Sequence, residues 1–304
     1  MPTSLSPRDL LAVGCIVLIW GSTFVAMKIA LQALTPLQLG VARYIFGVLP
    51  LILLVRPPRV HCKWVLLYGL VGGFGQFGLL FVSLEVGMSA ALASVLMQTQ
   101  IFFTALLSAL LLAEKPGRAL VLGMVLATAG LSCFALNYLL TQGGRDAETT
   151  WLGFLLVLGA AGMWGASNIV VRLVQRETAV FDTLGFIVWC SVVPIVPFIL
   201  LSLALDPAES RLSWLDAPLR SWLAVAYIGW GGSILAFTLW TGLIRRHGAN
   251  RIAPFSLGMP VVGLASGMLL LGETITGWQW IGTALIVAAL AVVIAGASSS
   301  RAAP

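Results

Sequence analysis

Residues 20–28 read WGSTFVAMK, a tryptophan–glycine step inside a long apolar run that ends in a lysine. The pattern returns 144 positions later as WGASNIVVR at residues 164–172, with the tryptophan, the glycine, a small polar residue and a terminal cation aligned. A second echo pairs LLLAE at 110–114 with LLLGE at 269–273, now 159 positions apart. Two echoes in the same order indicate that the chain consists of two related halves.

The composition places both halves in a lipid bilayer. Of the 304 residues, 60% are hydrophobic and 9% are charged, whereas about a quarter of the residues of a typical soluble domain are charged. The net charge of +6 does not indicate nucleic-acid binding, because the basic residues lie in short segments between apolar runs and form no basic domain. The first apolar run is too long for the core of a signal peptide, so we expect it to be retained as a membrane span.

Ten apolar segments are long enough to cross a bilayer as helices, which takes about 20 residues. They are 9–31, 36–55, 64–85, 89–112, 118–140, 151–171, 181–204, 219–244, 250–271 and 277–296. The longest connections, 141–150 and 205–218, are polar and rich in turn formers. The predicted fold class is therefore all-α, an integral membrane protein with ten transmembrane helices.

The lysines and arginines predict the orientation, because cytoplasmic loops carry an excess of both. With ten spans, twelve of them fall on the side of the two termini and four on the other side, while Arg43 lies within the second span. Both termini are therefore predicted to be cytoplasmic. Because five is odd, the first five spans (1–140) and the last five (151–296) must enter the membrane from opposite sides as an inverted repeat, followed by a tail at 297–304. In transporters with such repeats, the substrate site lies near the membrane midplane.

These features carry a resemblance to a known family. The WG step ends in Lys28, the second span contains Arg43, and the fourth span ends in LLLAE; the second half repeats the WG step, contains Pro260 and ends its ninth span in LLLGE. Over residues 10–296 the chain resembles the EamA family of the drug/metabolite transporter superfamily, most closely its YddG-type amino-acid exporters. The resemblance implies a basket of helices around a central cavity that moves small metabolites by alternating access. One departure is MQTQ at 97–100, where the family often has a proline, so symmetric gating is not implied.

Aromatic residues at mid-span positions are candidates for the cavity wall. Trp20 and Trp164 lie near the middle of their spans, whereas interfacial anchoring, the usual role of membrane tryptophans, suits the tryptophans near span ends. Asn168 follows Trp164 by one helical turn, so the two share a face. An apolar wall with amides suits an uncharged, amphipathic or zwitterionic solute.

Glutamines inside the spans are the second set of candidates. An amide in hydrocarbon needs either a wet cavity or a partner on another helix, and both interpretations stay open for Gln76. Gln98 and Gln100 are about 200° apart around a helix, so both cannot face the cavity centre. We favour Gln98. The predicted substrate-binding residues are therefore Trp20, Gln76, Gln98, Trp164 and Asn168.

Three cations are expected to act as gates or anchors. Lys28 and Arg172 end equivalent helices on opposite sides of the membrane, and the alternative is that they attract anionic groups as solute enters or leaves. Arg43 lies about seven residues into its span, where charge is expensive. It either snorkels or bonds carbonyls at helix ends, or it binds a substrate carboxylate. Glu114 and Glu273 end equivalent helices too, and we expect each to hold a short turn by contact with a cation.

Other motifs exclude several function classes. GFGQFG at 73–78 satisfies GxGxxG, but it lies inside a span rather than between a strand and a helix, so we expect close helix packing there. The sequence has no Ser-His-Asp set at membrane depth, no HExxH, no P-loop and no cluster of metal ligands. We therefore expect no enzyme activity, no metal and no cofactor. All eleven acidic residues lie at span ends or in loops, which favours facilitated diffusion or a coupling that uses no buried carboxylate.

Together these observations predict a multi-pass inner-membrane transporter that exports neutral or aromatic amino acids or related small metabolites. Its partners are the small-molecule solute and the bilayer, with no nucleic acid, and it is expected to be a monomer or a homodimer. One alternative is an exporter of drugs, although cationic drugs would favour an acidic residue in the cavity. A carrier of sugar phosphates or nucleotide sugars would want paired cations at depth. A membrane enzyme or scaffold would need polar groups clustered at one membrane face.

Overall fold

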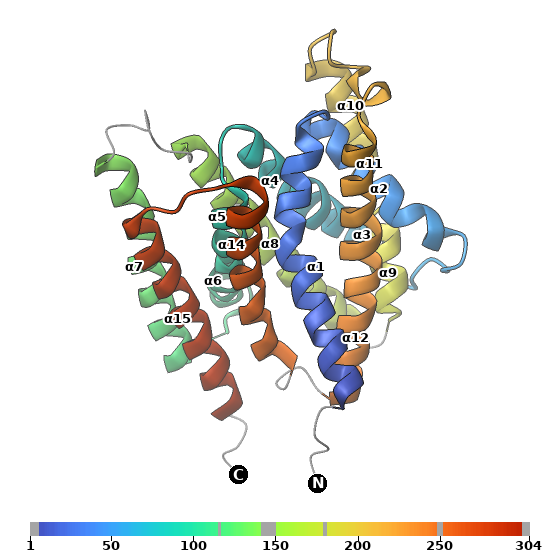
Figure 1. Cartoon of the computed structure of the whole chain (residues 1–304). Coiled ribbons are helices and arrows are strands. Elements are labelled where there is room, and N and C mark those ends of the chain that lie inside the picture. The colour runs from blue at the N-terminus through green and yellow to red at the C-terminus, as the bar shows by residue number, and fades with distance from the viewer. Residues whose placement is uncertain (1–5, 115–116, 141–149, 179–180, 248–251, 300–304) are drawn as a thin grey trace.

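The computed structural model describes residues 6–114, 117–140, 150–178, 181–247 and 252–299, and every regular element within these ranges is helical. The first half contains α1 (Pro7–Leu31), α2 (Pro36–Ile52), α3 (Cys62–Tyr68), η1 (Gly69–Gly75), α4 (Gln76–Glu85), α5 (Ala90–Leu96), η2 (Met97–Thr99), α6 (Gln100–Leu112) and α7 (Arg118–Leu140). The second half contains α8 (Trp151–Glu177), α9 (Thr183–Cys190), α10 (Ile195–Leu205), η3 (Ser213–Leu215), α11 (Leu219–Ala226), η4 (Tyr227–Leu235), α12 (Ala236–His247), η5 (Ala253–Leu257), α14 (Gly258–Leu271) and α15 (Gly277–Ser299). The helices form one bundle in which α1 begins and α15 ends at the same end (Figure 1).

The helix starts follow from local capping. The Ser6 hydroxyl accepts a hydrogen bond from the Asp9 amide, and the Asp9 carboxylate accepts one from the Ser6 amide, which gives a capping box in front of α1. Thr35 and Gln38 form the same box in front of α2. Both helices also carry proline in the first turn, where its missing N–H costs nothing.

Most of the predicted spans are present as long apolar helices. Within the described ranges, eight helical stretches are long and apolar enough to cross a membrane. They are Pro7–Leu31, Cys62–Glu85, Ala90–Leu112, Arg118–Asn137, Trp151–Glu177, Thr183–Leu205, Leu219–Ile244 and Gly277–Gly296. Pro36–Leu49 and Phe255–Leu271 are shorter apolar helices, and the first residues of the predicted span 250–271 lie outside the described ranges. The protein is therefore an all-helical membrane protein, and the count of ten spans stays a prediction.

Several stretches are not uniform α-helices. The π-helical η1 separates α3 from α4, and the π-helical η4 separates α11 from α12, so the third helix of each half contains a widened turn. The 3-10 turn η2 separates α5 from α6, and a turn at 191–194 ending in Pro194 separates α9 from α10. At its end, α15 continues to Ser299, into the predicted tail 297–304.

The glycine of each WG step marks a close approach between the halves. A Cβ atom on Gly21 would lie 2.6 Å from Val262 Cβ and 2.8 Å from the Met259 carbonyl oxygen, so α1 meets α14 there. A Cβ atom on Gly165 would lie 2.8 Å from Phe103 Cβ, so α8 meets α6. Only glycine lets the backbones come this near.

The GxGxxG region is also a packing site. A Cβ atom on Gly73, the first residue of the motif, would overlap the ring of Pro194. A Cβ atom on Gly69, one turn earlier, would lie 2.5 Å from Val193 Cβ and 2.7 Å from the Cys190 carbonyl oxygen. The glycine-rich η1 therefore packs against the break between α9 and α10, as the close-packing interpretation of this motif expected.

The LLLAE and LLLGE echoes end their helices in the same way. Ala113 (φ 55°) and Gly272 (φ 68°) both adopt the left-handed conformation that closes α6 and α14. The following amides, of Glu114 and Glu273, donate to the carbonyls of Ser108 and Gly267 respectively, each at 3.3 Å. Each glutamate thereby leaves its helix in a fixed direction.

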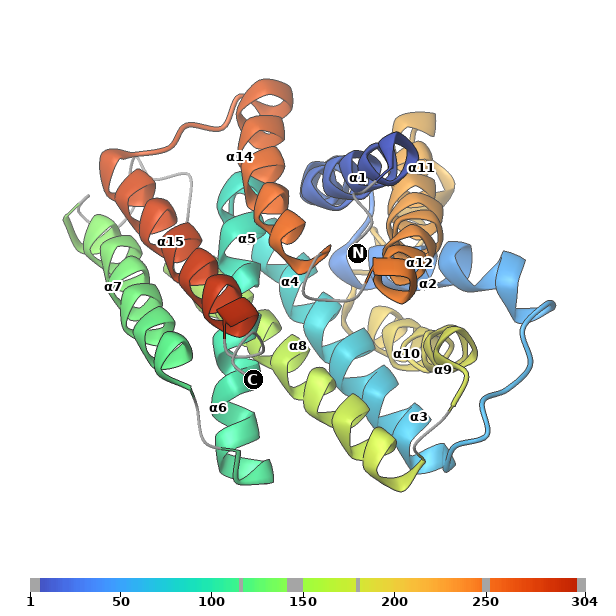
Figure 2. The same cartoon turned by 90° about the horizontal axis from the view of Figure 1, so that it is seen from below.

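The last helices of the two halves, α7 and α15, lie side by side in both views (Figures 1 and 2). We call this contact the α7–α15 seam. A Cβ atom on Gly130 would lie 2.8 Å from the Gly282 carbonyl oxygen, and one on Gly282 would lie 2.8 Å from the Gly130 carbonyl oxygen. The two backbones therefore touch directly, with Gly123 packing on Val293 further along the seam.

Candidate functional site

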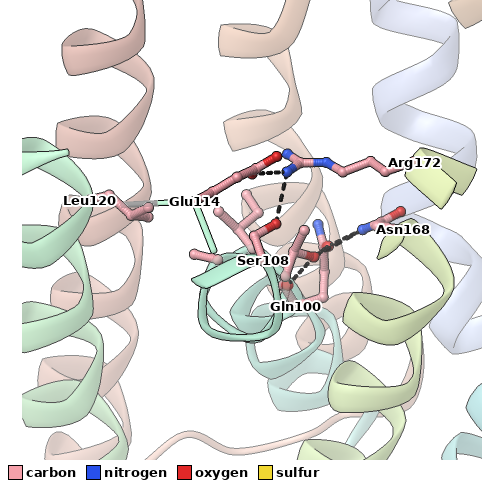
Figure 3. Close-up of a pocket in the computed structure, with 9 residues that line it drawn as sticks. Gln100, Ser108, Glu114, Leu120, Asn168 and Arg172 are labelled. Atoms are coloured by element: carbon pink, nitrogen blue, oxygen red, sulfur yellow. Dashed lines mark hydrogen bonds and ion pairs between the residues drawn. The ribbon is translucent and has the colours of Figure 1, made fainter. Parts of the chain in front are cut away.

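A cavity of about 320 Å³ lies between α6, α8 and the start of α7 (Figure 3). Its wall consists of Gln100, Ile101, Thr104, Ala105, Ser108, Glu114, Leu120, Asn168 and Arg172. Gln100, Thr104 and Ser108 are four residues apart along α6, and Asn168 and Arg172 are four apart along α8. Residues with this spacing share a helix face, so two polar stripes face each other across the cavity.

An amide network forms the inner part of the wall. The Asn168 Nδ2 atom donates to Gln100 Oε1 and to Thr104 Oγ1, each at 3.0 Å. The Thr104 hydroxyl donates in turn to the Gln100 carbonyl oxygen at 2.7 Å. These bonds offset the cost of placing amides inside an apolar bundle, and they hold the polar atoms at the cavity surface.

An ion pair stands at the outer part of the wall. The guanidinium of Arg172 contacts the Glu114 carboxylate and donates to the Ser108 hydroxyl at 2.7 Å (Figure 3). Arg176 Nη2 lies 3.9 Å from the other Glu114 oxygen. The side chains of Arg172 and Glu114 are 44% and 46% exposed, so both remain accessible. The site thus presents two cations around one carboxylate.

The equivalent residues meet at the opposite end of the bundle. Lys28 Nζ lies 3.9 Å from Glu273 Oε1. The Glu273 carboxylate also accepts hydrogen bonds from the amides of Ala90 and Ala91, at 2.6 and 2.8 Å, at the start of α5. Its side chain is only 8% exposed, and its negative charge lies at a helix N-terminus, which favours an anion. The expectation that both glutamates meet a cation is confirmed.

The other predicted cavity residues lie elsewhere. The Trp20 indole donates to the Gly232 carbonyl oxygen in η4 at 2.9 Å and packs on Trp240. Gln76 is buried at the start of α4, and within the described ranges its amide has no hydrogen-bond partner. Gln98 is half-buried in η2, outside the cavity wall, where Gln100 stands instead. Trp164 packs against the main hydrophobic core.

Arg43 lines a separate small cavity of about 30 Å³ between α2, α9, η4 and α12. Its guanidinium carbon lies 3.4 Å from the centre of the Phe77 ring, a cation–π contact. Its Nη2 atom lies 3.5 Å from Ser233 Oγ, at the limit of hydrogen bonding, while Nε and Nη1 have no partner among the described residues. Aromatic packing and one weak bond therefore hold this charge.

Comparison with known proteins assigns this arrangement to a family. The model of the EamA-like transporter family matches residues 9–136 and again residues 151–295. The chain belongs to the EamA-like transporter family. It is therefore a transporter and a multi-pass membrane protein, not an enzyme. Separately, within the described residues no group of histidine, cysteine and acidic side chains could hold a metal ion.

Individual relatives extend over nearly the whole chain. A protein of Salmonella typhimurium (strain LT2) named as a probable amino-acid metabolite efflux pump is 35% identical, and one of the same name in Escherichia coli (strain K12) is 33% identical, each over 96% of both chains. An uncharacterised transporter of Bacillus subtilis is 26% identical over 88% of this chain and 90% of its own. A solved crystal structure with 21% identity matches 95% of this chain and 98% of its own with a TM-score of 0.57, which supports the fold.

Of the residues in this wall, the sequence predicted Asn168 as a substrate-binding residue and Arg172 as a gate or anchor, but it did not predict Gln100, Thr104 or Ser108. The signal that could have found them is their spacing of four residues within an otherwise apolar span. Polar residues that recur once per turn in a membrane helix face protein or water rather than lipid.

Proposed function

We propose that this protein exports amino acids or related small metabolites across the bacterial inner membrane by alternating access. The observation that carries the proposal is the cavity between α6 and α8, where Asn168, Gln100 and Thr104 provide neutral polar contacts and the ion pair of Arg172 and Glu114 provides both signs of charge. The names of the two relatives that share 96% of the chain support amino-acid metabolites as the solute class.

We further propose ten spans in two inverted repeats, 1–140 and 151–296, with cytoplasmic termini. The two separate family matches support the repeats, as do the widened turns η1 and η4 and the left-handed residues Ala113 and Gly272. The short helices of α2 and 255–271 reach about 25 Å at 1.5 Å per residue, close to the thickness of the hydrocarbon core. The excess of basic residues on the membrane side of the two termini, twelve against four, supports the orientation.

In this arrangement an ion pair lies at each end of the bundle, and each repeat supplies one residue of each pair. Lys28 from the first repeat meets Glu273 from the second, and Arg172 from the second meets Glu114 from the first. We propose Lys28 and Arg172 as gate residues on opposite sides, with the Lys28 side closed and the Arg172 side open. The open side is the predicted cytoplasmic one, where an exporter takes up its solute.

The predicted residues that lie outside the observed cavity are proposed to act in other conformations of the transport cycle. Trp20, Gln76, Gln98 and Trp164 are proposed to line the path when the halves rearrange, and Arg43 is proposed as an anchor held by Phe77. Two arginines around one carboxylate make the observed cavity unfavourable for cationic drugs.

Uptake into proteoliposomes tests the proposal. Purified protein would be given a panel of radiolabelled neutral amino acids without an ion gradient, beside Asn168→Ala and a control, Thr128→Ala, whose exposed side chain on α7 bonds only its own helix. We expect saturable flux for the wild type and Thr128→Ala and a lower flux for Asn168→Ala. Absence of flux for every amino acid, with or without a proton gradient, would refute the assignment of the solute.

A further inference from the structure

We infer that Arg172 and Glu114 together form the recognition site for the two charges of a zwitterionic α-amino acid. The solute carboxylate binds Arg172 and the solute ammonium binds Glu114, so the solute replaces the contact that the two side chains make with each other. This inference rests on the proposed function and names the feature of the solute that the site recognises.

The comparison with the equivalent pair supports this role. Glu273 is nearly buried, and its carboxylate is held by two backbone amides, so its contact with Lys28 belongs to the structure of that end. Arg172 and Glu114 are almost half exposed, and both line the cavity. Of the two equivalent pairs, Lys28 and Glu273 are therefore held by the structure, whereas a solute can reach Arg172 and Glu114.

The charges favour exchange with a zwitterion over binding of a singly charged solute. When a zwitterion separates the pair, each side chain exchanges one opposite charge for another, and no charge is left without a partner. A solute without the carboxylate leaves Arg172 unpaired, and a solute without the ammonium leaves Glu114 with only Arg176, whose Nη2 atom lies 3.9 Å away. Either loss is unfavourable in a partly dehydrated site. A solute that lacks one of the two charges is thus rejected because Arg172 or Glu114 loses its closest partner.

The rest of the wall suits a neutral side chain. Ile101, Ala105 and Leu120 provide apolar surface beside the ion pair, while Asn168 supplies an amide one turn from Arg172. The cavity volume of about 320 Å³ lies at the lower end of the range for small-molecule sites. The Arg172 guanidinium can present two parallel N–H groups to a carboxylate, which adds geometric selectivity.

Competition in proteoliposomes tests the inference. The best amino acid from the uptake panel would be the labelled solute, and the unlabelled competitors would be the same amino acid, its amide, which lacks the carboxylate, and its N-acetyl derivative, which lacks the ammonium. For the wild type we expect both derivatives to compete about 10- to 100-fold less well than the parent, the range for losing one charge-assisted contact.

The variants then separate recognition from structure. Arg172→Gln is expected to reduce the disadvantage of the amide, and Glu114→Gln to reduce that of the N-acetyl derivative. Lys28→Gln and Glu273→Gln, at the equivalent pair, are the matched controls and should change the affinity for all three compounds by the same factor. Arg172→Lys, which keeps the charge, should bind the parent less tightly and still reject the amide.

The outcomes distinguish this inference from the proposed function. If the wild type transports amino acids but Arg172→Gln and Glu114→Gln change the affinity for all three compounds equally, the pair is structural and the inference is overturned. The same holds if Arg172→Lys no longer rejects the amide. If the wild type transports no amino acid at all, the proposed function fails, and the inference fails with it.

Discussion

The contact at Gly165 yields the sharpest prediction about how the cavity is built. In Gly165→Ala, the new Cβ atom would lie 2.8 Å from Phe103 Cβ and 2.9 Å from the Thr104 backbone nitrogen. Ordinary contacts begin at 3.4 Å, so α6 and α8 must separate by about 0.6 Å, and backbone atoms cannot rotate out of the way. Overpacking of this kind costs about 1–3 kcal/mol.

A matched control lies one turn earlier on the same helix. A Cβ atom on Gly162 would lie 3.8 Å from Phe103 Cδ1, an ordinary contact. Gly162→Ala and Gly165→Ala gain the same helix propensity, up to about 1 kcal/mol, so this gain cancels between them. The difference in unfolding free energy between the two variants is therefore about 1–3 kcal/mol.

Thermal unfolding in detergent micelles measures this difference. At about 2–4 °C per kcal/mol, the midpoint of Gly165→Ala should lie about 2–12 °C below that of Gly162→Ala. Its amino-acid flux should fall as well, because Asn168 bonds Gln100 and Thr104 across the same helix contact. Equal midpoints for the two variants would refute the close approach of α6 and α8.

Three further predictions concern the helix ends and the driving force. Glu273→Gln weakens two charge-assisted bonds, to the amides of Ala90 and Ala91, and should lower the unfolding free energy by about 1–3 kcal/mol; an unchanged unfolding midpoint would contradict this. Ala113→Gly relieves a left-handed alanine and should stabilise the protein by about 1 kcal/mol, whereas Gly272→Ala should destabilise it by a similar amount, and shifts of the same sign for both would disprove the shared conformation. Solute flux should move no protons, because the acidic residues lie at span ends or in loops; stoichiometric acidification in vesicles that contain a pH-sensitive dye would show proton coupling.

The sequence predicted most of the helices and the contacts of Glu114 and Glu273 with a cation. The WG echo marked Gly21 and Gly165 as equivalent positions, but their close approaches to α14 and α6 are known only from the structure. The sequence placed Asn168 on the same helix face as Trp164, since four residues make nearly one turn. In the structure the cavity partner of Asn168 is Arg172, one turn further along α8, whereas Trp164 packs against the main hydrophobic core.

The choice between Gln98 and Gln100 could not be made from the sequence. A straight α-helix through residues 89–112 would favour Gln98, whereas η2 tightens to about three residues per turn at Met97–Thr99. That change of pitch rotates all later residues relative to the earlier ones. The spacing of four residues links Gln100 to Thr104 and Ser108 within α6, but a periodicity calculated for a uniform helix through residues 89–112 does not place Gln98 relative to them.

The break at 191–194 and the environment of Arg43 could not be predicted either, because both depend on contacts between distant segments of the chain. Pro194 permits a break in the helix, but its position in the bundle depends on Gly69, from a helix more than a hundred residues earlier in the chain. The ring beneath the Arg43 guanidinium, that of Phe77, likewise comes from another helix. Contacts between distant segments leave no periodic trace in the sequence.

The α7–α15 seam also determines when the protein can be completed during synthesis. The ribosome makes Gly130 long before it makes Gly282, so the glycine face of α7 lacks its partner in the final fold until α15 has been made. Because close packing of small residues drives helix association within a bilayer, the two faces will join whether or not the chain between them is continuous. We therefore expect the N-terminal and C-terminal halves, made as separate polypeptides in one cell, to assemble through these two helix surfaces.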